Sequence, residues 1–348
     1  MKKSMMTKDY KYDVAVVVAI YNQCLSKIIL TVKSILVQKD ISIKIVIADD
    51  CSKNNHFFDI ENFLLLNGCN DYEILSSEEN KGTVFNLLRS IDYCDSEFVK
   101  FISPGDALFD EYSLSQWVGW TREKKALVTF SDAIYYEKID GGKYRCVKEH
   151  TYPQNVSVFY DCINTEKQMY YQVLCNDYWL GAATLINTFI AGKYLNKING
   201  IVKYGEDNIY RLMAYDGVMR CYYPNNAILY ECNTGISSLG SRGERWHKTL
   251  MEEWYQTSLI ILNYMDKNND ANKEKFEALI KWKYDSAFRG SKLKDKKLKK
   301  LFRELIPLYL KFPRLLFWHV KTIVNERCSN MVDDTVVEEK ILKYIDVN

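Results

Sequence analysis

The chain has 348 residues, enough to bury one large core and to carry an additional segment. Hydrophobic residues make up 47% of the sequence and charged residues 26%, as is ordinary for a soluble globular protein. Because the formal net charge is only +2, the composition gives no reason to expect a nucleic-acid partner.

Short apolar runs alternate with helical patterns in the first part of the chain. The predicted strands are residues 14–19, 43–48, 72–76, 98–102 and 127–130. The helices predicted between them are residues 25–37, 57–66, 83–91 and 114–123. This alternation indicates βαβ units and a mostly parallel central sheet flanked by helices, an α/β fold. Ligands of such sheets bind beyond the carboxyl ends of the strands, so the residues that follow each strand are the site candidates.

The later part of the chain is less regular. Residues 133–175 are rich in Tyr, Lys and Asp, with a hairpin signal at Asp140-Gly141-Gly142. A second organised stretch follows from residue 178 to about 241, and the pattern from residue 245 onward is mostly helical. We therefore expect a helical C-terminal appendage.

Two features bear on the compartment. The ten cysteines are scattered without a Cys-x-x-Cys pair, as expected for free thiols in a reducing compartment. Residues 1–13 contain no apolar signal-peptide core, and the longest apolar region, residues 305–324, is interrupted by prolines and charges. Both features predict a cytoplasmic protein without a membrane span.

Acidic residues follow the second predicted strand, where Asp49 and Asp50 precede Ser52. A carboxylate at the end of a buried strand is costly unless something binds it. It could accept the ring N–H of a uracil or a hydrogen bond from a ribose hydroxyl. The alternative is that Asp50 or Ser52 only caps the following helix.

Three further motifs each have a functional and a structural interpretation. Gly82, in Glu79-Asn80-Lys81-Gly82, would let the backbone approach a ligand, or is an ordinary turn glycine. Asp106, after Ser103-Pro104-Gly105, is a turn residue or an oxygen ligand for Mg²⁺ or Mn²⁺. Glu206 and Asp207 open a helical pattern, where the helix dipole alone favours acidic residues.

Taken together and in this order, the motifs resemble glycosyltransferase family 2. The resemblance covers residues 13–238 and is carried by the segments VVVAIYNQ, IVIADDCS, ENKGTVFNLL, SEFVKFISPGD and YGEDNIYRLM. It implies a GT-A fold, a nucleotide-diphospho-sugar donor and inversion at the anomeric carbon. The expected organisation is a catalytic domain over residues 13–244, nucleotide-binding in 13–132 and acceptor-binding in 133–244, followed by a helical region, 245–348.

The resemblance also assigns roles by position in the family's motifs. Contacts with the nucleotide sugar fall to Ala19, Tyr21, Asp49, Asp50, Lys81, Gly82 and Gly105. Asp106 matches the last aspartate of the metal-binding Asp-x-Asp motif and would hold Mn²⁺ or Mg²⁺ against the diphosphate leaving group. Asp207 matches the catalytic base, and Glu206 would position either the base or the acceptor.

Two departures from the family pattern stand out. Ser103 replaces the first aspartate of Asp-x-Asp, so metal binding would be weaker or would draw on the diphosphate and another side chain. In the Gln-x-x-Arg-Trp motif of processive members, Arg242 stands where Gln belongs, followed by Arg245-Trp246. Arg242 and Arg245 would contact the diphosphate, or are simply exposed.

The basic segment 289–303 and the apolar residues after it fit a helix on an anionic membrane surface, or a solvated face followed by ordinary packing. The sequence thus predicts metal-dependent, inverting transfer of one sugar, favouring a UDP-sugar donor, to a glycan or lipid-linked glycan in bacterial surface-polysaccharide biosynthesis. The enzyme would be cytoplasmic and peripheral on the inner face of the membrane. The alternatives are a catalytically impaired sugar-nucleotide-binding protein and a nucleotidyltransferase, although Ala19-Ile20-Tyr21-Asn22 is unlike the phosphate loop of the latter.

Overall fold

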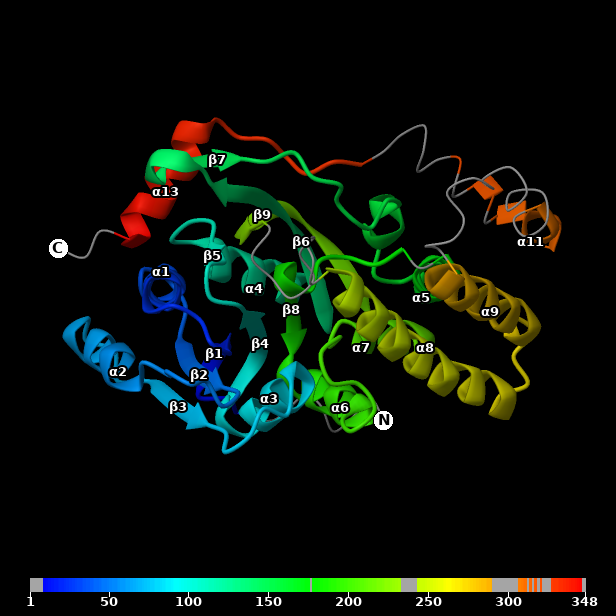
Figure 1. Ribbon diagram of the computed structural model, residues 1–348, viewed down its shortest axis with the longest axis horizontal. Helices are drawn as coiled ribbons and strands as arrows, with labels where there is room; N and C mark the ends of the chain where they lie inside the picture. Colours follow the sequence, from blue (N-terminus) through cyan, green and yellow to red (C-terminus); the bar gives the residue numbers. More distant parts are fainter. Residues whose placement is uncertain are drawn as a thin grey trace.

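The computed structural model describes residues 9–175, 177–232, 243–289, 306–311, 313–314, 316–317, 320 and 327–345. Nine strands in these residues form one sheet in the order β3-β2-β1-β4-β8-β6-β9-β5, and β7 pairs with β6 (Figure 1). The strands are β1 (Tyr12–Ile20), β2 (Ile43–Asp49), β3 (Tyr72–Ser76), β4 (Ser96–Ile102), β5 (Ala107–Leu108), β6 (Val128–Lys138), β7 (Tyr144–Cys146), β8 (Thr184–Asn187) and β9 (Arg220–Glu231).

The first half of the sheet is parallel. Strand β1 pairs in parallel with β2 and β4, and β2 pairs in parallel with β3. Both faces of these strands are buried, with Val16 and Val18 of β1 in one core cluster and Ala15 and Val17 in the other. Such strands have apolar side chains on both faces, which explains why their sequences are continuous hydrophobic runs.

Helices cover both faces of the sheet, giving three layers (Figure 1). One face is packed by α1 (Leu25–Leu36), α2 (Phe57–Leu66) and α4 (Ser113–Glu123). The other face is packed by α3 (Thr83–Ser90), α6 (Thr188–Ile198) and α7 (Asn208–Tyr215), with α5 (Thr165–Met169) beside α7. The five predicted strands and four predicted helices of the first half are confirmed, with small shifts at their ends except for the last strand, which is longer than predicted.

The second half of the sheet contains more strand residues than the sequence predicts. Strand β6 continues to Lys138 rather than ending at residue 130, because Ile134, Tyr135 and Tyr136 are also buried. The predicted hairpin is present, since β6 and β7 pair in antiparallel fashion around Gly141, which has a φ of 80°. Strand β8 runs antiparallel to β4, so its first residue lies at the same edge of the sheet as the carboxyl end of β4.

One expectation about the cysteines is wrong. Cys162 and Cys221 form a disulfide with a Cα–Cα distance of 5.2 Å, whereas the other eight cysteines are free. The two partners are 59 residues apart, and only the fold brings them together. The sequence spacing therefore gave no sign of the pair.

The C-terminal region contacts the rest of the protein in two places. Helices α8 (Gly243–Lys267) and α9 (Lys273–Arg289) pack side by side, α8 lies on α7, and α11 (Ile306–Lys311) lies beside α9. The final helix, α13 (Asp334–Ile345), packs against α1 and β7 at the opposite end of the molecule in Figure 1. Among the described residues, no helix combines the length and apolar character that a bilayer crossing requires.

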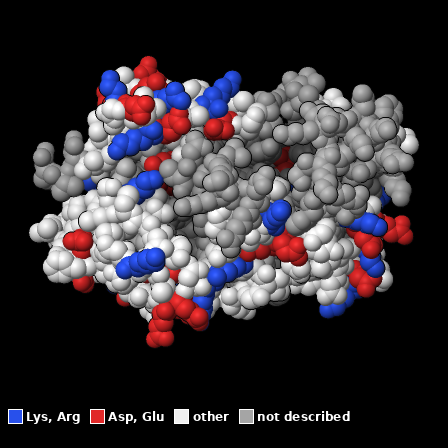
Figure 2. Space-filling view, in the orientation of Figure 1, with Lys and Arg blue, Asp and Glu red and all other residues white. Residues whose placement is uncertain are grey.

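The described part of the face shown in Figure 2 carries lysine and arginine side chains interleaved with aspartate and glutamate. Charges of both signs on one surface offer no continuous basic path for a polyphosphate backbone.

Candidate active site

The carboxyl ends of β1 and β2 are tied together by short loops. The Asp50 amide donates to the Ile20 carbonyl at 2.9 Å, and the Asn22 amide donates to the Ser52 hydroxyl at 2.7 Å. Beside this junction Ala19 is partly buried, whereas Tyr21 is 45% exposed. The exposed ring of Tyr21 leaves an aromatic face free at the edge where the sequence places a nucleoside.

At this edge of the sheet, Asp49 has one carboxylate oxygen that accepts no hydrogen bond from the described residues. The side chain is only 1% exposed, and its Oδ2 accepts the Ser52 amide at 2.9 Å. The other oxygen, Oδ1, is buried and has no hydrogen-bond partner in the described part of the chain. Since an unsatisfied buried acceptor costs about 1–3 kcal/mol, this atom is suited to a donor group on a ligand.

Both carboxylate oxygens of Asp50 accept hydrogen bonds from the loop after β3. Its Oδ1 accepts the Lys81 amide at 2.9 Å, and its Oδ2 accepts the Gly82 amide at 2.8 Å. Gly82 has a φ of 90°, and a Cβ there would collide with the side chain of Lys203. Asp50 therefore holds the loop after β3 in place, and only glycine fits at position 82.

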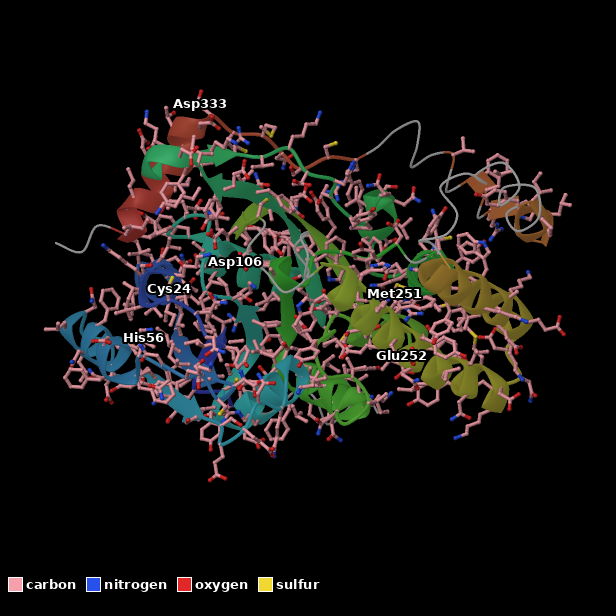
Figure 3. The ribbon with its side chains drawn as sticks, in the orientation of Figure 1. Cys24, His56, Asp106, Met251, Glu252 and Asp333 are labelled. Atoms are coloured by element: carbon pink, nitrogen blue, oxygen red, sulfur yellow. A yellow bond between two sulfur atoms is a disulfide. The ribbon has the colours of Figure 1, made fainter. Side chains whose placement is uncertain are left out.

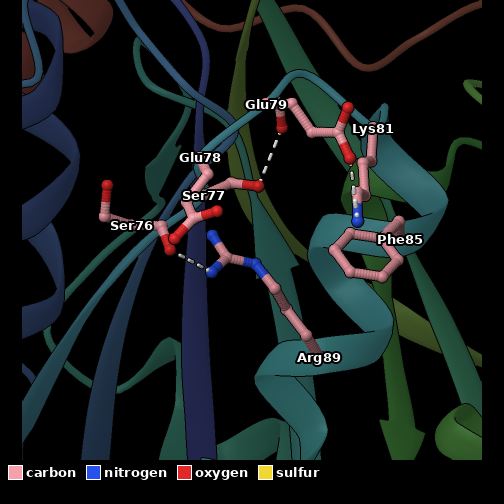
Figure 4. A pocket seen from close by; sticks show the side chains of 7 residues that line it. All are labelled: Ser76, Ser77, Glu78, Glu79, Lys81, Phe85 and Arg89. Carbon is pink, nitrogen blue, oxygen red and sulfur yellow. Dashed lines mark hydrogen bonds and ion pairs between the residues drawn. The ribbon is translucent and has the colours of Figure 1, made fainter.

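A pocket of about 490 Å³ opens beside this loop (Figure 4). It is lined by Ser76, Ser77, Glu78, Glu79, Lys81, Phe85 and Arg89. The Lys81 ammonium lies 3.1 Å from the Glu79 carboxylate and 4.7 Å from the centre of the Phe85 ring. Arg89, which the sequence analysis did not single out, donates to the Asp49 carbonyl at 2.7 Å and fixes the end of β2.

Asp106 lies in the turn between β4 and β5, near the centre of the molecule in Figure 3. Its Oδ1 accepts the Glu231 amide at 3.0 Å. Burial raises the pKa of Asp106 to about 7, against the opposing effects of the Glu231 amide and of nearby lysines. Gly105 has a φ of 102°, and a Cβ there would collide with the Glu231 carboxylate. Glu231, absent from the predicted site, is therefore packed directly against the turn that carries Asp106.

Glu206 and Asp207 immediately precede α7, as the sequence predicts. Asp207 is exposed, yet burial of its surroundings raises its pKa to about 7. Burial and the charge of Asp207 raise the pKa of Glu206 to about 8. A Cβ on Gly181 would collide with the Asp207 carboxylate, so the turn before β8 lies against it.

Comparison with known proteins fits this geometry. Residues 15–177 match the model of the family described as glycosyl transferase family 2. Residues 15–177 therefore form a domain similar to that family. The match covers the ends of β1, β2, β3 and β4, and therefore includes Asp49, Lys81 and Asp106.

Solved structures of glycosyltransferases share the fold. The crystal structure of TarS 1–349 from S. aureus has 15% identity and a TM-score of 0.52, covering 96% of this chain and 89% of that one. TarS 1–349 in complex with UDP-GlcNAc gives 14% identity, a TM-score of 0.51 and the same coverage. The longer TarS structure gives 16% identity and a TM-score of 0.51. That match covers 90% of this chain but only 54% of the TarS chain. The family 2 domain therefore has a GT-A fold. A search of curated sequences found no match.

The residues of this domain would hold a divalent cation only together with the phosphates of a bound substrate. No group of three His, Cys, Asp or Glu side chains suited to a metal occurs among the described residues. Asp106 and Glu231 are two adjacent carboxylates, although Glu231 is also paired with Lys27 at 2.7 Å. Mg²⁺ is commonly held by one or two carboxylates together with substrate phosphates and water. The residues present fit that mode and not a cage made by protein alone.

A buried lysine links the two acidic positions of the domain. Lys100 on β4 is fully buried, and its ammonium donates to the Ala182 carbonyl at 2.5 Å and to the Phe101 carbonyl. Ala182 follows Gly181, which lies against Asp207. Lys100 thus fixes the turn beside Asp207 to the strand that leads to Asp106. A lysine within the apolar run SEFVKFI was the sequence signal for this residue.

Tyr152 and Tyr178 form a stacked aromatic pair. Tyr178 is 45% exposed, and its ring stacks on Tyr152 with 4.7 Å between centres and 20° between planes. Burial, Tyr152 and then the charge of Asp207 raise the pKa of Tyr178 to about 12. The charge of Asp207 is therefore one of the groups that act on the Tyr178 hydroxyl.

Some predicted residues lie outside the described part of the chain. Arg242 is among them, and for Arg245, in the first turn of α8, only the backbone is described. Most of the basic segment 289–303 is also outside it. Trp246 is described, and its ring meets Tyr204 edge-on with 4.8 Å between centres. The side chains of the two arginines are therefore not described.

Proposed function

We propose that this family 2 domain transfers a single sugar from a UDP-sugar to a hydroxyl of a glycan or lipid-linked glycan, with inversion at the anomeric carbon. The observation that carries the proposal is the state of Asp207, an accessible carboxylate whose pKa is raised to about 7. A general base works best when its pKa lies near the working pH. Asp207 therefore has the properties that proton removal from an attacking hydroxyl requires.

Donor binding is assigned to residues 13–132. The free Oδ1 of Asp49 is an acceptor for the ring N–H of uracil, and Tyr21 offers a ring face beside it. TarS structures with UDP and with UDP-GlcNAc have the same fold, which supports a UDP-sugar as the donor. The loop of Lys81 and Gly82, held by Asp50, would meet the diphosphate or sugar.

The reaction is one displacement. A divalent cation bound by Asp106, with Glu231 beside it, would neutralise charge on the diphosphate leaving group. Asp207 accepts the proton of the acceptor hydroxyl while its oxygen forms a bond to the anomeric carbon from the face opposite UDP. The bond from that carbon to the diphosphate oxygen breaks with its electron pair, so UDP leaves and the configuration inverts. No residue of the chain becomes covalently attached.

The acceptor side is assigned to residues 133–244. An exposed ring such as Tyr178 offers an apolar face on which a sugar ring can stack, with a hydroxyl at its rim. We assign the biological role to bacterial surface-polysaccharide assembly at the inner face of the membrane. The basic segment 289–303 supports this location. Recovery with anionic vesicles but not with neutral ones, and loss of binding in high salt, would test it.

Calorimetry with UDP and GDP, with and without Mn²⁺, tests the donor assignment. Asp49→Asn should weaken UDP binding by about 10–100-fold, because Asn must turn its NH₂ toward Ser52 or toward the base, and a hydrogen bond to a charged group contributes about 1.5–3 kcal/mol. Asp59→Asn, on the exposed side of α2, is the matched control and should bind UDP normally. Tight GDP binding without UDP binding would overturn the assignment.

Release of UDP from UDP-sugars with candidate acceptors then tests the reaction. Turnover supports the transferase. Binding without turnover across acceptors would favour the impaired sugar-nucleotide-binding protein, and pyrophosphate release from UTP with a sugar phosphate would favour the nucleotidyltransferase.

A further inference from the structure

A buried carboxylate from the C-terminal region holds the segment that leads into the base. Glu253, in the third turn of α8, is only 6% exposed. Its Oε1 accepts the amides of Lys203 at 2.9 Å and Tyr204 at 3.0 Å, and its Oε2 accepts the amide of Gly205 at 2.7 Å. These three residues directly precede Glu206-Asp207.

The chemistry of this contact is specific. Three consecutive backbone amides converge on one charged acceptor, and such charge-assisted bonds are about twice as strong as neutral ones. A Cβ at Gly205 would stand only 3.0 Å from the Glu253 Oε2, closer than ordinary packing allows. The glycine of the Gly-Glu-Asp motif therefore lets the carboxylate close on the backbone.

The same segment also reaches the donor loop. The Lys203 carbonyl accepts the amide of Val84 at 3.1 Å, and the Lys203 ammonium donates to the Asn80 carbonyl at 3.2 Å. Gly82 lies against the Lys203 side chain. Residues 203–205 thus connect the loop assigned to the nucleotide sugar with the carboxylate assigned to the proton.

Helix α8 is itself fixed to α7, which begins directly after Asp207. The buried Arg211 of α7 donates to the Trp254 carbonyl at 3.2 Å and to the Ser258 hydroxyl at 2.9 Å. Its guanidinium lies 4.6 Å from the centre of the Trp254 ring. Glu253 therefore lies on a helix that is itself bonded to α7.

We propose that Glu253 is a positioning residue that sets the distance between the bound donor sugar and Asp207, by anchoring residues 203–205 to α8. The inference rests on the proposed function and deepens it, because it gives the helical region a part in the sugar transfer. A displacement of about 1 Å at a reacting group can cost about 100-fold in rate. Loss of the anchor should therefore lower kcat, while Asp50 still holds the amides of Lys81 and Gly82 and preserves donor binding.

The test uses Glu253→Gln, which keeps the size of the side chain but replaces one acceptor oxygen by NH₂. The matched control is Glu252→Gln, the neighbouring position of α8 (Figure 3), whose carboxylate bonds Gln256 and Tyr284 and not the loop. For Glu253→Gln we expect kcat to fall about tenfold or more, with the KM for the donor within about twofold. The control should keep both values.

Hydrogen–deuterium exchange of the free protein provides a readout that does not need activity. A peptide covering residues 203–209 should exchange faster in Glu253→Gln and remain unchanged in Glu252→Gln, with equal melting temperatures as evidence that both variants fold. Unchanged exchange would overturn the anchor itself. Faster exchange in Glu253→Gln with an unchanged kcat would overturn the positioning role alone. Faster exchange in Glu253→Gln, when the wild-type protein shows no transfer activity, would overturn the proposed function but not the anchor.

Discussion

Replacing Asp207 by Asn should separate the proton transfer from every other part of the reaction. Asn has nearly the same shape, so it should occupy the same space against Gly181. It cannot accept a proton, and a general base contributes about 10²–10⁴-fold to the rate. We therefore expect kcat to fall by about that factor, while UDP and metal binding stay nearly intact.

The pH dependence gives a second, quantitative signature. Burial raises the pKa of Asp207 to about 7, so the basic form is populated only above that pH. At pH 6 about one tenth of the molecules would carry ionised Asp207, and at pH 8 about nine tenths, which predicts a rise in kcat of about tenfold. Burial and the charge of Asp207 also raise the pKa of Glu206. Glu206→Gln keeps the Asp207 carboxylate, so a rise in kcat with pH should remain in that variant.

The assay is kcat between about pH 5 and about pH 9, measured from UDP release at saturating donor, acceptor and metal ion. Saturation keeps the metal site in one state throughout, so the acidic limb reports the base. A limb centred near pH 4, or near-normal turnover of Asp207→Asn with its limb intact, would refute the assignment of Asp207. Glu206 would then be the first residue to test as the base.

Three further substitutions should fail in different ways. Asp106→Ala should weaken both metal-dependent UDP binding and turnover, and calorimetry with and without Mn²⁺ checks this; equal affinity in both conditions would contradict it. Gly181→Ala should lower kcat about tenfold or more without unfolding the protein, because its methyl group displaces the Asp207 carboxylate, and unchanged kinetics would show that the turn gives way instead. Tyr178→Ala should raise the KM for the acceptor several-fold through lost stacking, whereas Tyr178→Phe keeps it; a raised donor KM would place the ring on the other substrate.

The first half of the fold was predictable because its signals are local. Continuous apolar runs in β1 and β2 and the helical spacing of α1 need no knowledge of distant residues. Strand β8 has only four residues and β5 only two, and each is a strand only because β4 or β9 lies beside it. Their sequences carry no comparable pattern.

The candidate site likewise contains some residues that a local sequence pattern identifies and others that only the fold identifies. Asp106 and Asp207 were identified because they occupy fixed positions after a strand and before a helix. The contact of Asp50 with the loop after β3 could not be predicted, because it depends on how that loop folds back. Glu253 lies among ordinary acidic residues of α8, and only packing against residues 203–205 distinguishes it from Glu252.

The position of α13 has a consequence for how the molecule is made. Val337 and Ile341 of this helix are buried against the core near β5, and the Tyr344 hydroxyl donates to the Leu108 carbonyl at 3.2 Å. Leu108 lies two residues beyond Asp106, so the segment that follows the turn of Asp106 is covered by residues made more than 200 positions later. A nascent chain that does not yet include α13 therefore lacks the cover beside that turn.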